Sequence, residues 1–539
     1  SYYAIRGVGP LSQPLSPDDT SVVTYVDGVP QPLFGADLSF LDVERVEVLR
    51  GPQGTLFGRN TSGGAINITT RKPGKETEFG LRGEYGEEES AMGQAVASGS
   101  LIDDRLAARL AVRYKGAGSY VDNTEGDDLG AFDSFAGRGT VVLTPGESTT
   151  FTLGLFGQVD RNEPPIFVLF ENDGYPEAAV TESESERRAG GASLIAEQVF
   201  DWATLTSTTG VNSVESQIDT DDTDGLIFGA LFGFPPSFFA PETDFSDWDE
   251  EEISVSQELR LNSPEDSAFD WVGGLAYYHN TFDARYENQS GFFAATNGTR
   301  DVELTTNSLS AFGEVTVPLM EGLEATAGLR YSHDWKDYEA TFTGNGFPGT
   351  VDFFEESGDL TYDYVTGRAA LAYDLTEAVT VYGTVARGYK DGGFPRFPTD
   401  SSGGVATEPY ESTVTWTYEA GAKSELFGGR AQVNVAAFLN EVSDEQLYAF
   451  DGGSGTFRPA NVDLRSYGAE IEAAVRLARG LDLTGSLGYT HARLRNVGDD
   501  LAAATGAEDG NRAPNVPEVG AAAALQYFGP AEWLLLPED

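Results

Sequence analysis

From about residue 76 onward, the chain alternates apolar residues with polar or small ones in stretches of roughly ten to fifteen positions. One such stretch runs from Leu106 to Tyr114, and another from Leu481 to Tyr489. A period of two places apolar side chains on one face of a β-strand and polar side chains on the other. The pattern therefore predicts many strands, each with an apolar and a polar face.

The connections between these strands alternate in length. Short turns, such as 144–148 and 318–322, are followed by long polar segments at 116–133, 160–190, 216–252, 283–303, 336–361, 390–411, 441–463 and 493–514. Outer-membrane barrels have short turns at one end and long loops at the other. We expect an all-β fold, a transmembrane antiparallel barrel with about 18–19 strands present.

A soluble β-sandwich or propeller is the alternative, because its strands also alternate. No motif recurs at the period of roughly 40 residues that propeller blades show. Aromatic residues collect near the predicted strand ends, as an interfacial girdle requires. They are Trp202, Trp271, Tyr331, Tyr373, Trp416, Tyr418, Tyr489 and Tyr527. The membrane barrel is the favoured interpretation.

The first 75 residues differ from the rest. They contain seven acidic and seven basic residues, and their short strands at 22–26, 43–49 and 65–70 are joined by glycine- and proline-rich turns. We expect two domains: a small mixed domain at 1–75 and the barrel at 76–539. A phosphate-binding loop is a weak interpretation of this segment, because no Gly-Lys-Ser/Thr follows its glycines.

Residues 25–29 (YVDGV) and 42–73 (DVERVEVLRGPQGTLFGRNTSGGAINITTRKP) closely resemble the plug domain of TonB-dependent outer-membrane receptors. The motif positions are Asp27, Gly28, Gly51, Pro52, Gly54, Gly58, Gly63 and Gly64. Looser similarities to the family's barrel lie at 388–394 (GYKDGGF), 418–423 (YEAGAK), 467–472 (YGAEIE) and 515–518 (NVPE). Together these similarities extend over almost the whole chain.

The resemblance implies a barrel of about 22 strands with the plug in its lumen. It implies a location in the outer membrane of a Gram-negative bacterium, among lipid and lipopolysaccharide. It also implies active uptake, with a ferric siderophore as the default cargo and TonB with its inner-membrane motor complex as partners. In this family a TonB box and the first half of the plug would precede Ser1, and further strands would follow residue 539. A passive porin or a surface adhesin is the alternative.

Two carboxylates are predicted to hold the plug. In strand 412–426 the apolar residues occupy even positions, which turns Glu419 inward, and the opposite parity in strand 463–476 does the same for Glu470. Each lies eight residues before its turn, so both should sit at a similar depth. We expect them to form ion pairs with Arg6 and Arg50 of the plug. The alternative is that all four face lumenal water.

Cargo contacts are expected from aromatic residues in the long segments: Phe228, Phe232, Phe238, Phe239, Tyr389, Phe394 and Tyr410. Asp219, Asp221 and Asp224 weakly resemble a calcium loop, but the twelfth position is Ala230, where a bidentate glutamate belongs. A solvated acidic loop is the favoured interpretation there. By parity Arg109, Arg113 and Arg330 face inward, where they either contact anionic cargo or, as we favour, balance lumenal carboxylates.

The charge and residue composition argue against several classes of function. The chain has 86 acidic and 34 basic residues, for a net charge of −52, and the eight long segments hold 47 acidic and 12 basic of them. Such a balance argues against a nucleic-acid binder. There is no cysteine, only three histidines, and no Gly-x-Ser-x-Gly or His-Glu-x-x-His motif. We therefore expect neither an enzyme nor a resident cofactor. An acidic exterior also suits a saline medium.

Overall fold

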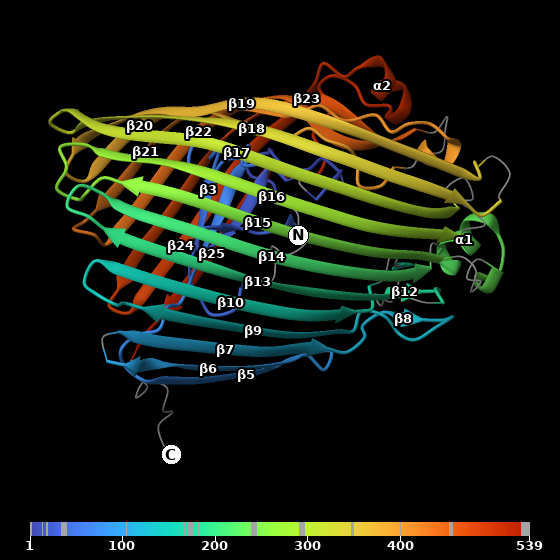
Figure 1. Cartoon of the computed structure of the whole chain (residues 1–539), viewed down its shortest axis with the longest axis horizontal. Coiled ribbons are helices and arrows are strands. Elements are labelled where there is room, and N and C mark those ends of the chain that lie inside the picture. Colours follow the sequence, from blue (N-terminus) through green and yellow to red (C-terminus); the bar gives the residue numbers. More distant parts are fainter. Residues whose placement is uncertain are drawn as a thin grey trace.

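The computed structural model describes residues 3–12, 14–17, 20–33, 40–103, 105–164, 169–170, 176–181, 183–221, 223–238, 245–289, 297–346, 350–398, 400–451 and 456–529. Two parts are distinct among them. A small sheet built from the first 70 residues lies within a large barrel built from the rest (Figure 1). The sheet ends at Thr70, and the first barrel strand begins at Glu78.

The plug sheet has four strands in the order β2-β1-β4-β3. They are β1 (Val22–Val26), β2 (Val29–Pro30), β3 (Val43–Arg50) and β4 (Gly64–Thr70). Strands β1 and β4 run parallel, and the other pairs are antiparallel. The β-branched residues Val22, Val26, Ile66 and Ile68 form the buried core between these strands. Tyr3, Ile5 and Val43 of the same domain pack against this core.

The barrel contains eighteen strands in one closed sheet, in which β25 is followed by β5. They are β5 (Glu78–Tyr85), β6 (Ala91–Ile102), β7 (Leu106–Ala117), β9 (Phe132–Leu143), β10 (Thr149–Asn162), β13 (Ser183–Val199), β14 (Thr204–Asp221), β15 (Phe245–Asn262), β16 (Asp270–Gln289), β17 (Gly298–Met320), β18 (Leu323–Gly344), β19 (Phe353–Thr376), β20 (Val379–Lys390), β21 (Thr413–Leu426), β22 (Ala431–Asp451), β23 (Thr456–Ala478), β24 (Leu481–Arg495) and β25 (Val519–Tyr527). The predicted all-β barrel with an internal plug is confirmed.

Smaller elements lie at the end of the barrel opposite the short turns (Figure 1). A three-stranded sheet joins β8 (Asp122–Asn123), β11 (Leu169–Phe170) and β12 (Pro176–Ala178). Helix α1 (Gly225–Phe232) and the 3-10 turn η2 (Pro236–Phe238) follow β14, η4 (Asp400–Gly403) follows β20, and α2 (Asp499–Thr505) follows β24. Neither α-helix is long and apolar enough to cross a membrane.

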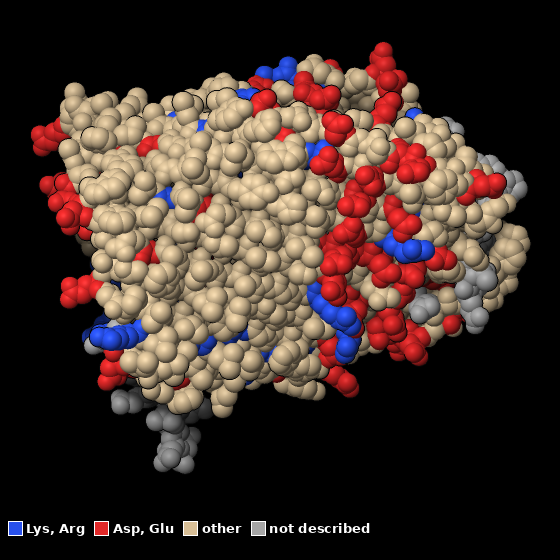
Figure 2. All heavy atoms as spheres, in the orientation of Figure 1, with Lys and Arg blue, Asp and Glu red and all other residues tan. Residues whose placement is uncertain are grey.

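Residues that alternate along the sequence face the outside and the inside of the barrel wall in turn. Leu275, Leu309, Leu329 and Leu371 are exposed on the outer face, while neighbouring polar residues such as Ser310 and Thr366 are buried against the plug. Figure 2 shows the result on one face of the barrel, as a broad region of largely uncharged surface. Such a band matches the apolar belt of an outer-membrane protein.

A charge placed in this band should destabilise the barrel. We expect Leu329→Arg to lower the free energy of unfolding by roughly 2–4 kcal/mol, because the guanidinium would face hydrocarbon. The measurement is urea unfolding of protein inserted in lipid vesicles. Glu339→Arg is the matched control, since residue 339 lies on the same outward face of β18 among acidic side chains, and the change should alter the value little. Equal losses in both variants would contradict the assignment of the band.

The long polar segments were predicted as loops, and this was wrong for much of their length. Strand β16 continues to Gln289 and β17 begins at Gly298, although 283–303 was predicted as a loop. The same holds for 336–361, where β18 ends at Gly344 and β19 starts at Phe353. The strands project beyond the apolar band, where the alternation is reversed: charged residues face outward, and apolar residues such as Ala284, Tyr286 and Val302 are buried inside. The many charges of these segments were interpreted as loop.

Much of the negative charge lies on these strand extensions. Carboxylates face outward on neighbouring strands and form a belt beside the apolar band, which we call the acidic girdle (Figure 2). Its members bordering an open groove of about 560 Å³ are Glu186, Glu215, Asp249, Glu251, Asp283, Asp301, Glu303 and Glu339. The charge therefore sits largely on the outer wall, and not only on loop tips.

Candidate functional site

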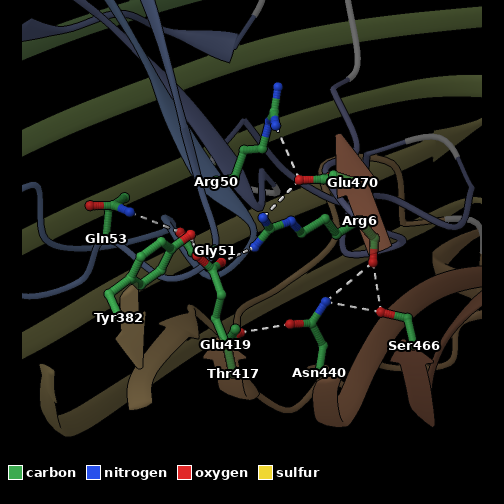
Figure 3. Close-up of polar contacts among 10 residues, drawn as sticks. All are labelled: Arg6, Arg50, Gly51, Gln53, Tyr382, Thr417, Glu419, Asn440, Ser466 and Glu470. Carbon is green, nitrogen blue, oxygen red and sulfur yellow. Dashed lines mark hydrogen bonds and ion pairs between the residues drawn. The ribbon is translucent and has the colours of Figure 1, made fainter. Parts of the chain in front are cut away.

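Arg6 of the plug lies between two carboxylates of the barrel wall (Figure 3). Its guanidinium donates one hydrogen bond to Glu419 on β21 and another to Glu470 on β23, the second at 2.8 Å. Arg50, at the end of β3, donates to the same Glu470 at 3.0 Å and also to Glu472. We call these five residues the Arg6 latch.

The backbone around Arg6 directs its side chain at the wall. Arg6 and Gly7 both have positive φ, 54° and 79°, and form a tight turn closed by hydrogen bonds between Ile5 and Val8. The Arg6 carbonyl accepts hydrogen bonds from Asn440 at 3.2 Å and Ser466 at 2.6 Å. The wall therefore binds the backbone of this turn as well as the Arg6 guanidinium.

The latch is strong because it is shielded from water. The Arg6 side chain is 4% exposed, and its guanidinium lies 4.6 Å from the centre of the Phe438 ring. Burial lowers the pKa of Arg6, but its hydrogen bonds to Glu470 and Glu419 and their charges outweigh burial and raise that pKa overall. Tyr382 donates to the second oxygen of Glu419 at 2.6 Å. Each charge thus has its partners, which a buried ion pair requires.

A second ion pair holds the plug, and in it the charges of plug and barrel are reversed. Arg109 of β7 donates to both carboxylate oxygens of Asp42 in the plug, at 2.5 and 2.7 Å, and to Glu78 of β5 at 2.8 Å. Leu41 beside it packs against Ala111 and Ala136 of the wall. Here the barrel supplies the arginine and the plug supplies the acid. We call Arg109, Asp42 and Glu78 the Asp42 latch.

The plug motif residues shape the turns around these contacts. Asp27 and Gly28 form the turn between β1 and β2 with φ of 48° and 83°. The Asp27 carboxylate also accepts hydrogen bonds from the backbone and hydroxyl of Thr70 at 3.0 and 2.6 Å, which joins the carboxyl ends of the parallel strands β1 and β4.

The remaining motif residues hold the loop from Gly51 to Gly64 against the wall. Gly51 donates to the Gly63 carbonyl at 3.0 Å, and the Gly54 carbonyl accepts from Thr366 of β19 at 3.0 Å. A side chain at Gly64 would meet the Leu49 carbonyl at 2.3 Å, so the close approach requires glycine. Pro52 packs beside Gly388, and Gly58 lies against Arg330 of β18.

Comparison with protein families gives matches for both parts of the chain. The TonB-dependent receptor plug domain matches residues 1–65, and the TonB-dependent receptor-like β-barrel matches residues 120–536. The chain belongs to the TonB-dependent receptor family.

Curated relatives and solved structures support this family over most of the chain. The receptor is 26% identical to the pesticin receptor of Yersinia pestis, covering 97% of this chain and 73% of that protein. It is 21% identical to the catecholate siderophore receptor Fiu of Escherichia coli K12, covering 93% and 71%. The ferric yersiniabactin uptake receptor FyuA of Yersinia pestis has the same fold, with a TM-score of 0.81, 22% identity and coverage of 97% and 76%.

Three of the aromatic residues predicted to contact cargo are buried in the receptor. Tyr389 stacks on Tyr364 with ring centres 3.7 Å apart, and Phe394 stacks on Tyr338 at 4.5 Å. The Tyr410 hydroxyl donates to Ser16 of the plug at 2.8 Å. Tyr389 lies on β20, Phe394 and Tyr410 lie in the segment after it, and none of the three side chains faces open solvent. Their contact with cargo stays a prediction.

The other aromatic candidates lie at the far end of the receptor, on α1 and η2 (Figure 1). Phe228 stacks on Phe232, and Phe234 stacks on Phe238. Phe232 and Phe238 remain exposed. Phe239 lies outside the described residues. Contact between these rings and cargo stays a prediction.

The weak calcium candidates do not converge. Asp224 caps α1 by accepting from the Ile227 amide, and it also accepts from the Ala179 amide. Asp221 accepts hydrogen bonds from Thr181 and Thr223. Asp219 lies opposite Asp247 on the neighbouring strand. No cluster of three or more acidic or histidine side chains that could hold a metal is found within the described ranges. Asp221 and Asp224 are buried and accept hydrogen bonds within the protein, so they do not belong to the solvated acidic loop that was favoured, and calcium binding stays a prediction.

Several residues of the latches were missed from sequence. Glu472 has the same parity as Glu470, so its inward direction was predictable. No sequence pattern indicated that Asn440 and Tyr382 belong to the site, because their contacts depend on which strands become neighbours. Asp42 and Glu78 were equally hidden, since only the folded barrel brings them to Arg109.

Proposed function

We propose that this receptor imports a ferric siderophore across the outer membrane of a Gram-negative bacterium. The observation that carries the proposal is a plug held inside the barrel by two ionic latches, which leaves a barrel that needs energy to open. TonB and its inner-membrane motor are the proposed source of that energy. The cargo class is inferred from relatives named as siderophore receptors.

The charge distribution supports the proposed location. The uncharged band has the character of a surface that faces hydrocarbon, and the acidic girdle lies beside it. We infer that the girdle lies among lipopolysaccharide, where divalent cations can bridge its carboxylates to lipid phosphates. A passive porin is disfavoured, because the plug occupies the lumen that a porin leaves open. Nothing in the arrangement favours an adhesin or an enzyme.

Iron uptake tests the proposal directly. Cells that express the full receptor as their only uptake route should accumulate radiolabelled iron from a ferric siderophore. This accumulation should fall to background when a protonophore collapses the proton gradient or when TonB is deleted, because the docked plug blocks diffusion. A panel of catecholate, hydroxamate and thiazoline chelates would identify the cargo.

Two outcomes would contradict parts of the proposal. Uptake that persists without the proton gradient would point to a passive pore. Energy-dependent uptake of a different nutrient, without uptake of any iron chelate, would agree with the proposed transport mechanism and contradict the proposed cargo.

A further inference from the structure

A cavity of about 80 Å³ lies between the plug and the barrel wall. Tyr25, Phe57 and Arg59 line it from the plug, and Ser310 and Arg330 line it from β17 and β18. It is several times larger than the space that one water molecule needs. It is far too small for a siderophore, so it is separate from any cargo site.

Arg330 is a buried cation at this cavity. The residue is 6% exposed, and its guanidinium donates to the hydroxyls of Ser310 at 2.5 Å and Ser332 at 3.4 Å. Its second terminal nitrogen, Nη1, is buried and makes no hydrogen bond. Within the described ranges, the partners of Arg330 are hydroxyls and an aromatic ring, with no carboxylate among them.

The guanidinium is held in place by its surroundings. The Phe312 ring lies 5.1 Å away on one side. On the plug side, a side chain at Gly58 would come within 2.6 Å of Arg330, so the plug backbone packs directly on the charge. Gly58 has φ of 91°, a conformation that glycine favours. Arg330 therefore cannot turn out to solvent while the plug is docked.

The other charged groups at the cavity have partners of their own. Glu258 pairs with Arg260 at 2.9 Å, and Glu252 accepts a hydrogen bond from Asn280 at 2.6 Å. Arg59 of the plug lies 3.8 Å from Asp391. The Tyr25 hydroxyl donates to the Phe57 carbonyl, and burial raises the pKa of Tyr25, so this group stays neutral. Among the residues that the structure describes, no carboxylate contacts Arg330.

An unpaired buried charge is costly, and a bound counter-ion removes most of that cost. We propose that the cavity binds a small monovalent inorganic anion of the halide class, held by Arg330 and the Ser310 hydroxyl. A divalent anion is disfavoured, because Glu252 and Glu258 line the same cavity. The anion lies between Arg330 of the wall and Arg59 of the plug, lowers their mutual repulsion, and so favours the docked plug.

Limited proteolysis of the plug tests this proposal in the full receptor. The cleavage rate is compared in sodium chloride and in sodium gluconate at equal ionic strength, since gluconate is too large for the cavity. We expect cleavage to be about tenfold slower in chloride at ten times its dissociation constant, because anion binding reduces the population of released plug. Equal rates in the two salts would overturn the proposal.

Two variants and one diffraction experiment complete the test. Arg330→Gln should cleave at the same rate in both salts. Arg368→Gln should keep the chloride effect, because Arg368 on β19 already binds Glu314 through two hydrogen bonds. Crystals of unaltered receptor in sodium bromide should show anomalous density beside Arg330. A chloride effect that survives Arg330→Gln, or a bromide-soaked cavity without anomalous density, would refute the site.

Discussion

Reversing the charge of Glu419 should free the plug from the barrel. In Glu419→Arg the new guanidinium faces Arg6, and Arg6 keeps only Glu470 as a partner. Breaking a buried pair from one side costs about 3–5 kcal/mol. The lower value applies here, because the Glu419 side chain is 16% exposed. About 3 kcal/mol raises the population of released plug by roughly two orders of magnitude.

Two measurements report this release. Protease added to the periplasmic side of outer-membrane vesicles should cleave the plug faster, and cells should become sensitive to large antibiotics that the closed barrel excludes. Glu472→Gln is the matched control. Glu472 also pairs with the plug, through Arg50, but its side chain is 42% exposed, and exposed pairs contribute little. If Glu419→Arg resists protease as the unaltered receptor does, Arg6 and Glu419 do not hold the plug.

Reversing the charge on the barrel side should break the Asp42 latch. Arg109→Asp places an acid against Asp42 and Glu78, and the loss should again reach about 3–5 kcal/mol, since both Arg109 and Asp42 are buried. The double variant Asp42→Arg, Arg109→Asp restores an ion pair across the interface. Its recovery should be partial, because residue 42 has φ of 59°, where a long side chain costs roughly 1–2 kcal/mol.

Plug proteolysis and antibiotic entry serve as the measurements for this latch too, with barrel folding checked by heat-modifiable migration on gels. Arg113→Gln is a suitable control, because Arg113 on the same strand only donates to the Phe40 carbonyl at 3.4 Å. A double variant no better than Arg109→Asp alone would show that the pair itself does not position the plug.

The two latches together suggest how the plug finds one orientation. On β21 and β23 the wall is acidic and the plug is basic, whereas on β5 and β7 the arginine belongs to the wall. A plug rotated in the lumen until Arg6 reached β7 would bring Arg6 toward Arg109. Like charges would then meet in a site with little water, which opposes that orientation.

Local patterns predicted the features that depend on strand period and turn chemistry. The inward direction of Glu419, Glu470 and Arg330 follows from alternation alone, because successive side chains of a strand point to opposite faces. The barrel architecture and the plug motif could likewise be recognised from sequence. The interpretation failed beyond the apolar band, where acidic residues face outward while Phe282, Tyr286 and Val302 are buried inside, so that 283–303 looked like a loop although it is mostly strand.

Alternation and the plug motif were enough to predict a barrel with a plug and, within the apolar band, which strand residues face the lumen. What each inward side chain contacts depends on the assembled barrel. It paired Arg109 with Asp42, buried Tyr389 and Phe394, and left Arg330 without a carboxylate. The physical reason is that alternation is a property of one strand, whereas a partner in the lumen depends on the tilt of the wall and the pose of the plug. Both are set by contacts between residues hundreds of positions apart.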